Sequence, residues 1–281
     1  MISIITVCHN SGALMPDYLS SFLAHNKDKA GKDDIEFIFA ENSSDPGTEA
    51  FSAELQGHDF RARTIYVENH GFGAGCNSGA KLARGELLVF ANPDIRFVSD
   101  LTPIEAHFDK HSWGTIRQTN SNGSTHAFDL LPEHRSVFTE LARPFKYLHR
   151  FPSLYRLCYP VGSFMIIPRG AFEKEGGFDE RFFLYYEEAE LSRRMHARLG
   201  PPKYCSDMSI LHEAFGTQSN RDFTFREEAR GMVTYARVTG QPHLAECRLR
   251  TLRCLAALSP TSAKRIPFLR DAISAAEDKV A

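Results

Sequence analysis

The segment ISIITVCHNSG, residues 2–12, decides the fold, because a short run of apolar and β-branched side chains gives way at once to a polar loop. Such a run predicts a buried strand. Similar runs recur through the first hundred residues, and segments with helical spacing separate them. The further strands are expected at 35–40, 63–67 and 86–91, and the helices at 18–25, 48–56 and 78–83. This alternation predicts right-handed βαβ units, and therefore an α/β fold with a mainly parallel sheet flanked by helices.

The pattern is irregular between about residues 100 and 160 and becomes clear again beyond them. Strands are expected at 161–168 and 203–211, and a helix at 187–199 that is ended by a Gly-Pro-Pro sequence. From residue 226 onward the pattern is helical, with breaks expected at Pro242, Pro260 and Pro267. The chain is therefore expected to end in a helical tail.

Composition excludes several classes of protein. The 281 residues are 42% hydrophobic and 24% charged, which argues against a disordered chain, a collagen or a coiled coil. Lys plus Arg is 33 and Asp plus Glu is 35, so we expect no nucleic-acid partner. The six cysteines form no C-x-x-C pair, which argues against a zinc ribbon and a thioredoxin motif. With no signal peptide pattern and no apolar stretch of about 18 residues, a cytoplasmic protein is expected.

Polar residues follow each of the first four predicted strands. In parallel α/β sheets, ligands bind at the carboxyl ends of the strands. The residues expected there are His9 and Asn10, then Glu41, Asn42 and Asp45, then Glu68, Asn69 and the glycine-rich segment 71–79, and finally Asn92 and Asp94. Acidic and polar groups gathered around a glycine-rich segment are typical of a nucleotide site.

The glycine-rich segment GFGAGCNSG, residues 71–79, matches no dinucleotide or phosphate-loop pattern. Glycine allows the backbone to approach a ligand closely or to adopt positive φ angles. From the residues alone, a ligand-binding loop and a tight structural loop are equally good interpretations of this segment.

Two acidic motifs are candidates for chemistry. Asp94, in the sequence Asn-Pro-Asp, stands where one carboxylate can hold a divalent metal that grips a diphosphate, although a simple strand-ending turn also explains it. Glu187 and Glu188 follow an apolar and aromatic run, where one of them can act as a general base. Carboxylates that complement a helix dipole are the alternative interpretation. His212 is by itself an ordinary loop histidine.

The order and spacing of these motifs resemble glycosyltransferase family 2, the inverting nucleotide-sugar transferases with a GT-A fold. The resemblance is closest to the bacterial rhamnosyltransferase-like branch, and it extends over about residues 2–219. The motifs that carry it are IITV with HNS at 4–11, ENSSD at 41–45, NHGFGAGCN at 69–77, ARGE at 83–86, NPD at 92–94, GSFM at 162–165, GGFDERFF at 176–183, EEAEL at 187–191, and His212.

The resemblance implies a role for each matching residue. The donor would be bound by Thr6, His9, Asn10, Glu41, Asn69, Gly71, Phe72, Asn77, Asn92 and Asp94. Asp94 and His212 would hold a divalent metal, Mn²⁺ or Mg²⁺, with Asn92 in place of the first Asp of the family's D-x-D element. Glu188 would be the catalytic base, with Glu187 as its alternative.

The resemblance also implies an activity and a domain organisation. The chain would transfer a sugar from dTDP-L-rhamnose or a UDP-sugar to a hydroxyl group of a glycan or lipid-linked acceptor, in cell-surface polysaccharide assembly. Residues 1–220 would form the catalytic domain, with a nucleotide-binding half at 1–100 and an acceptor half at 101–220. Residues 221–281 would form a helical extension.

Two segments rich in basic residues bear on the acceptor. Residues 130–160 mix aromatic and basic side chains, which is typical either of an acceptor wall or of a solvated basic lobe around core aromatics. Residues 248–270 hold six basic and no acidic residues among leucines. That composition predicts either a peripheral contact with the inner face of a membrane or a helix packed on the catalytic domain.

Other functions leave different signatures. A nucleotidyltransferase acting on sugar phosphates would carry a basic, glycine-rich loop directly after the first strand, where this chain has His9 to Gly12. A non-catalytic glycan-binding relative would be expected to lose Asp94 and Glu188, and both are present. An oxidoreductase is disfavoured because the dinucleotide pattern fails.

Overall fold

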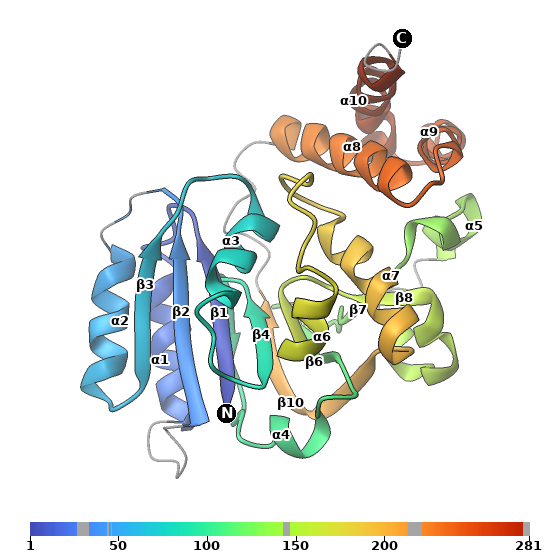
Figure 1. Cartoon of the computed structure of the whole chain (residues 1–281). Coiled ribbons are helices and arrows are strands. Elements are labelled where there is room, and N and C mark those ends of the chain that lie inside the picture. The colour runs from blue at the N-terminus through green and yellow to red at the C-terminus, as the bar shows by residue number, and fades with distance from the viewer. Residues whose placement is uncertain (27–33, 44, 46, 143–146, 213–220, 278–281) are drawn as a thin grey trace.

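The first hundred residues form four parallel strands of one large sheet (Figure 1). The computed structural model describes residues 1–26, 34–43, 45, 47–142, 147–212 and 221–277. β1 pairs in parallel with β2 and β4, and β2 pairs in parallel with β3. The bounds are Ile2–Cys8 for β1, Ile35–Glu41 for β2, Arg61–Tyr66 for β3 and Leu87–Ala91 for β4. The four predicted strands and their common direction are confirmed.

The sheet continues with strands of mixed direction, in the order β3-β2-β1-β4-β9-β6-β10-β5. β9 is antiparallel to β4 and β6, β10 is parallel to β6, and β5 is antiparallel to β10. The bounds are Ile95–Phe97 for β5, Gly114–Thr119 for β6, Phe164–Pro168 for β9 and Lys203–His212 for β10. β7 (Phe128–Leu130) and β8 (Cys158–Pro160) form a separate two-stranded ribbon.

Helices cover both faces of the sheet, and the alternation of side chains along β1 separates the two cores. Ile2 and Ile4 pack with residues of α1 and α2, whereas Ile5 and Val7 pack with α3, α6 and α7. The bounds are Met15–Asn26 for α1, Gly47–Gly57 for α2, Phe72–Ala80 for α3, Ile104–His107 for α4, Val137–Ala142 for α5, Arg169–Lys174 for α6 and Glu187–Leu199 for α7. Short 3₁₀ helices lie at Pro132–His134, Leu148–Arg150 and Pro152–Leu157.

The structure corrects the prediction for the glycine-rich segment. This segment is a helix from Phe72, so the helix expected at 78–83 begins six residues earlier. The glycines permit this because they face the sheet at very short range. A Cβ atom on Gly75 would lie 2.9 Å from Val7, and one on Gly79 would lie 2.6 Å from Ile5. The glycines therefore let α3 approach β1 closely.

The C-terminal residues form three packed helices, α8 (Arg221–Val238), α9 (His243–Leu255) and α10 (Pro260–Glu277). Pro267 lies inside α10, so the break expected there is wrong. The helix persists because its flanking residues Ile266, Phe268 and Leu269 pack into the core that the three helices share. No helix of the described residues is both long and apolar enough to cross a bilayer.

The same core accounts for most apolar residues of segment 248–270. Leu249, Leu252 and Leu255 are buried, whereas Leu258 is 71% exposed. The structure shows this segment as helices packed on the rest of the chain, which was one of its two interpretations. The peripheral membrane contact stays a prediction.

The close approach of α3 and β1 predicts that Gly79→Ala destabilises the protein. The added methyl group would meet Ile5 at 2.6 Å, and overpacking of this kind costs about 1–3 kcal/mol. Gly170→Ala in α6 is the matched control, because a Cβ atom there has no neighbour within 4 Å. The control is expected to be neutral or stabilising by up to about 1 kcal/mol. Chemical denaturation measures both, and equal stabilities would contradict the argument.

Candidate functional site

The ends of β1, β2 and β3 are joined by a short hydrogen-bonded chain of polar side chains. His9 Nδ1 lies 2.7 Å from Asn42 Oδ1, and Asn42 Nδ2 donates to Asn69 Oδ1 at 3.3 Å. Asn69 Oδ1 also accepts from the backbone N–H of Gly71. His9 and Asn69 come from loops about sixty residues apart in sequence, and both are exposed. The structure therefore brings these predicted donor residues together at one edge of the sheet.

The loop after β1 is held against the loop after β2. Asn10 has a φ of 50°, and its N–H donates to Ser43 Oγ at 2.7 Å. The Asp45 carboxylate accepts from the N–H groups of Gly12 at 2.8 Å and Gly47 at 2.9 Å. Asn10 is exposed at this edge, so a ligand there can reach its side chain.

Two of the predicted donor residues lie beneath these loops. Thr6 is fully buried, and its hydroxyl lies 3.1 Å from that of Tyr18. Glu41 is 1% exposed, and its carboxylate accepts from the N–H and hydroxyl of Ser43 and from the hydroxyl of Thr48. Both residues support the loops from below, and their direct contact with a donor stays a prediction.

The start of α3 is bonded to the segment that precedes α7. Gly71 has a φ of 103°, and a Cβ atom on it would lie 2.2 Å from the carbonyl oxygen of Phe183. The N–H of Phe72 donates to this same oxygen at 2.9 Å. Asn77 bonds both backbone groups of Phe178 and the carboxylate of Glu180, each at 2.9 Å. Gly71, Phe72 and Asn77 therefore fix the approach to α7, and their donor contacts stay predictions.

Asp94 and His212 meet through the pairing of β5 with β10. His212 lies opposite Ile95 in this antiparallel pair, and Ile95 directly follows Asp94 in the chain. The His212 Nε2 atom lies 3.3 Å from Asp94 Oδ1, and this oxygen is buried without an aligned hydrogen-bond donor among the described residues. A carboxylate with a free lone pair next to an imidazole is a donor set that suits Mn²⁺. Asn92 lies next to them, and its N–H donates to the Ser163 carbonyl.

Glu187 and Glu188 open α7 behind an unusual backbone turn. Tyr185 and Tyr186 have φ angles of 70° and 73°, a conformation that side chains rarely adopt and that costs on the order of 1–3 kcal/mol per residue. The turn fits tightly against α8, because a Cβ atom on Gly231 would lie 2.5 Å from the carbonyl oxygen of Tyr185. A C-terminal helix thus holds the turn that aims the two carboxylates.

The two carboxylates point to different halves of the molecule. Glu187 lies against α3, where its Cβ atom is 3.8 Å from a Cβ built on Gly73, and its charge acts on Cys76. The carboxylate of Glu188 lies 3.7 Å from a Cβ built on Gly162, beside the ribbon β7–β8. This divergence agrees with the angle of about 100° between successive side chains of a helix.

Burial raises the pKa of both carboxyl groups. The pKa of Glu187 lies well above its ordinary value because the group is desolvated and because Glu188 is close. Desolvation raises the pKa of Glu188 to about 7. Each group also has one buried oxygen without a hydrogen-bond partner among the described residues. A pKa of about 7 lets the Glu188 carboxyl group both lose and regain a proton near neutral pH.

Glu188 has charged and aromatic neighbours outside the motifs that carry the family resemblance. Asp129 and Arg135 form an ion pair, and both act on the charge of Glu188. Tyr159 is buried beside them, and its pKa is raised first by burial and then by Asp129 and Glu188. Arg135 and Tyr159 belong to the segment 130–160, for which an acceptor wall was one of the two interpretations, whereas Asp129 lies just before it and no local pattern connects it to Glu188.

The predicted acceptor wall at 130–160 divides into exposed and buried aromatics. Phe138 is 77% exposed and Tyr147 is 53% exposed, whereas Tyr155 and Tyr159 are buried. Phe145 lies outside the described residues. An acceptor wall does not account for the two buried tyrosines, and a basic lobe around core aromatics does not account for the exposed Phe138 and Tyr147.

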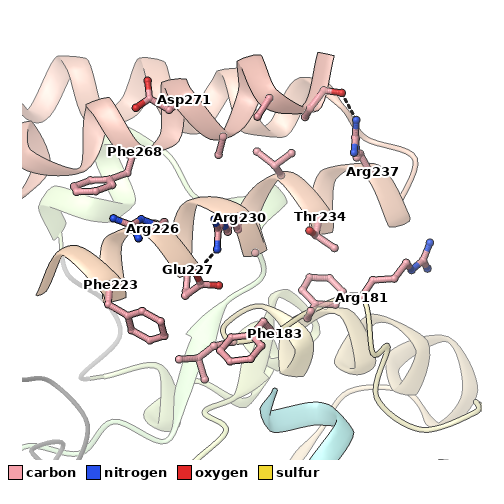
Figure 2. A pocket seen from close by; sticks show the side chains of 17 residues that line it. Arg181, Phe183, Phe223, Arg226, Glu227, Arg230, Thr234, Arg237, Phe268 and Asp271 are labelled. Carbon is pink, nitrogen blue, oxygen red and sulfur yellow. Dashed lines mark hydrogen bonds and ion pairs between the residues drawn. The ribbon is translucent and has the colours of Figure 1, made fainter. Parts of the chain in front are cut away.

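A groove of about 880 Å³ lies between α8, α10 and residues 181–184 (Figure 2). Phe183, Phe223 and Phe268 supply its aromatic surface, and Arg226 and Arg230 extend from α8 along it. None of the residues predicted to be catalytic or to bind metal lines it. The groove approaches Glu187 through its wall residue Phe183, which lies four residues earlier in the chain.

Sequence comparison gives one family and one relative. Residues 3–176 match the family described as Glycosyl transferase family 2. Over 196 residues the chain is 28% identical to the low-salt glycan biosynthesis hexosyltransferase Agl10 of Haloferax volcanii, covering 63% of this chain and 58% of that protein. The chain therefore spans less than two thirds of the relative's length.

Solved structures share the fold at low sequence identity. The mannosyltransferase PcManGT from Pyrobaculum calidifontis, in complex with GDP-Man and Mn²⁺, has a TM-score of 0.63 at 14% identity over 99% of this chain and 86% of that one. S. aureus TarS 1–349 in complex with UDP-GlcNAc has a TM-score of 0.56 at 14% sequence identity, over 99% of this chain and 92% of that one. GalNAc-T7 in complex with UDP, GalNAc and Mn²⁺ has a TM-score of 0.65 at 13% sequence identity, over 97% of this chain and 55% of that one. These likenesses confirm the predicted mixed α/β fold of GT-A type.

The raised pKa of Glu188 predicts that Glu188→Gln stabilises the protein at pH 8. An unfolded Glu has a pKa of about 4.3, so the parent loses stability as pH rises from there to about 7, while the amide does not. We expect a gain of about 1–3 kcal/mol at pH 8 that vanishes near pH 4. Thermal unfolding across this pH range measures it, with the exposed Glu54→Gln as control. A gain that is equal at both pH values would contradict the assignment.

Proposed function

The chain belongs to glycosyl transferase family 2, and on that premise we propose that it transfers a sugar from a nucleotide-diphosphate donor to a hydroxyl group of a glycan or lipid-linked acceptor. The observation that carries the proposal is the arrangement of two acidic sites. The Asp94–His212 pair lies at the polar edge where β1 to β4 end, and an ionisable Glu188 lies at the start of α7. One site suits the leaving diphosphate and the other suits the attacking hydroxyl.

The donor is proposed to be a nucleotide-linked hexose. The relative is a hexosyltransferase, and two of the similar structures hold GDP-Man or UDP-GlcNAc. Within this class, dTDP-L-rhamnose or a UDP-sugar remains our proposal for the donor. His9, Asn10 and Asn69 line the exposed edge on which the nucleoside would lie.

Asp94 and His212 are proposed to hold a divalent metal ion, as Mn²⁺ accompanies two of the similar structures. When bound, such an ion supplies positive charge that stabilises the departing diphosphate. Asp94 Oδ1 is buried beside His212 Nε2 and accepts no hydrogen bond from the described residues, which supports this role because burying a carboxylate oxygen without a hydrogen bond is otherwise costly.

Glu188 is proposed to act as the general base. Its carboxylate takes the proton of an acceptor hydroxyl while the oxygen attacks the anomeric carbon from the face opposite the diphosphate. The bond to the diphosphate breaks in the same displacement, so the anomeric configuration inverts. A pKa of about 7 places Glu188 where a base both ionises and accepts a proton effectively at neutral pH.

The groove beside α8 is a candidate for part of the acceptor. Phe183, Phe223 and Phe268 offer aromatic faces on which sugar rings stack, and Arg226 and Arg230 offer charge for an anionic group. Its wall at 181–184 leads directly into α7. We propose that it binds a portion of the acceptor away from the reacting hydroxyl.

Asp94→Ala is predicted to lower the transfer rate by about a hundredfold or more, since the charge stabilisation at the leaving group depends on this carboxylate. His212→Ala should act in the same direction more weakly, and Mn²⁺ should support a higher rate than Mg²⁺. Calorimetry should show weaker binding of the nucleoside diphosphate with Mn²⁺. Glu54→Ala, at an exposed position of α2 outside the groove, is the control. Unchanged turnover of Asp94→Ala would exclude this metal site.

Glu188→Gln is predicted to reduce kcat by about a hundredfold or more while donor affinity stays nearly unchanged. In the parent, kcat/KM for the acceptor should fall as pH drops below about 7, because the base becomes protonated. The glutamine variant should lose this pH dependence. Glu187→Gln should cost less and retain the profile. If Glu187→Gln is the more impaired variant, the two roles are exchanged.

A further inference from the structure

A second group of metal-ligand side chains lies at the opposite end of β10 from His212. Among the described residues, His107, Cys205 and Asp207 form one group of three whose ligand atoms all lie within 4.8 Å of one another. His107 ends the short helix α4, whereas Cys205 and Asp207 lie in the first half of β10. In Figure 1, α4 and the start of β10 are neighbours at the foot of the sheet, away from the edge where β1 to β4 end.

A bulge in β10 brings this group together. The pairing of β10 with β6 is interrupted between Cys205 and Ser209, where three residues of β10 have no partner in the register. Asp207 lies in this interruption, and its Oδ2 atom is 3.6 Å from His107 Nε2. Bulges often redirect a side chain toward a functional position. The backbone of His107 is also fixed, because its carbonyl oxygen accepts from Lys203 Nζ.

The chemistry of the three ligands differs from that of the Asp94–His212 pair. A thiolate, an imidazole and a carboxylate together favour zinc, since sulfur and nitrogen ligands select Zn²⁺ over the hard ions Mg²⁺ and Mn²⁺. Ligand atoms around a tetrahedral zinc ion lie about 3.3–3.8 Å apart, given bonds of about 2.0–2.3 Å. The His107–Asp207 distance already meets this spacing. Because the His107 side chain is partly exposed and that of Asp207 is exposed, small rotamer adjustments can bring them onto the sulfur of the buried Cys205.

We propose that His107, Cys205 and Asp207 bind a zinc ion that links α4 to β10, with water in the fourth position. The site is independent of the proposed transfer reaction, because it lies at the other end of β10 from His212. Its position gives it a structural consequence. β10 pairs with β6 on both sides of the bulge and with β5 at its far end, so a bound ion at the bulge fastens the strand that carries His212.

The test uses the full chain, freed of metal with a chelator, and Co²⁺ as a spectroscopic probe for Zn²⁺. A cobalt–thiolate bond gives a charge-transfer absorption in the near ultraviolet that oxygen and nitrogen ligands do not give. We expect this band to saturate at one Co²⁺ per chain and to disappear when Zn²⁺ is added. Cys205→Ser should abolish it, and His107→Ala should weaken Co²⁺ binding by at least about tenfold.

Two control variants isolate the site. Cys247→Ser and Cys254→Ser remove the exposed cysteines and should keep the full band. Zn²⁺ should raise the melting temperature of the parent and of these controls, but not that of Cys205→Ser, whose folding in chelator is checked by circular dichroism. Absence of a thiolate band in the parent, or its persistence in Cys205→Ser, would overturn the proposal. Asp94→Ala should leave the band unchanged, which separates this site from the proposed catalytic metal.

Discussion

The adjacent carboxyl groups of Glu187 and Glu188 impose the main constraint on this structure, because burying two acids side by side is unfavourable. Each has an oxygen without a hydrogen-bond partner among the described residues, and burial raises the pKa of both. The surrounding structure has to offset this cost. It does so with close packing from two sides, since α3 lies against Glu187 and α8 presses on the turn at Tyr185 and Tyr186. The strained turn persists only because these contacts fix it.

Close approach through glycine is how the two sides reach the pair. Gly73 and Gly75 bring α3 onto Phe178 and Val7, and Gly231 brings α8 onto the carbonyl oxygen of Tyr185. A methyl group at any of these positions would lie within 3.0 Å of a neighbouring atom. These glycines thus allow close packing between helices and neighbouring segments. For the segment 71–79, the sequence had suggested a loop instead. The same packing sets the distance between the polar edge of the sheet and α7, because the N–H of Phe72 donates to the carbonyl oxygen of Phe183 across that gap.

The sequence predicted the elements whose signals are local. Strands β1 to β4 and helix α7 have clear periodicity, so their existence, type and direction could be derived, and the polar residues after each strand could be assigned to one edge. The first two turns of α3 could not, because glycine has low helix propensity and the close approach to Val7 that requires glycine there has no local signal. The same limit applies to the site. Asp94 and His212 are 118 positions apart, so only the family resemblance could pair them, and Asp129 and Gly231 have no local pattern that connects them to Glu188.

The helices α8 to α10 are integral to the candidate site, although the sequence suggested an extension that begins at 221. Their core includes Tyr159, Phe182 and Ala189 from the preceding part of the chain, so it is shared across the predicted boundary. Gly231 fixes the turn before α7, and α8 with α10 forms two walls of the groove in Figure 2. Under the proposed function, the donor residues come from the first half of the chain, whereas the aim of the base and the shape of the groove depend on the last sixty residues. Differences in α8 and α10 would then alter the choice of acceptor while leaving the donor edge intact. Loss of these helices would release the turn at Tyr185 and Tyr186, and with it the position of Glu188, even though Glu188 itself lies outside them.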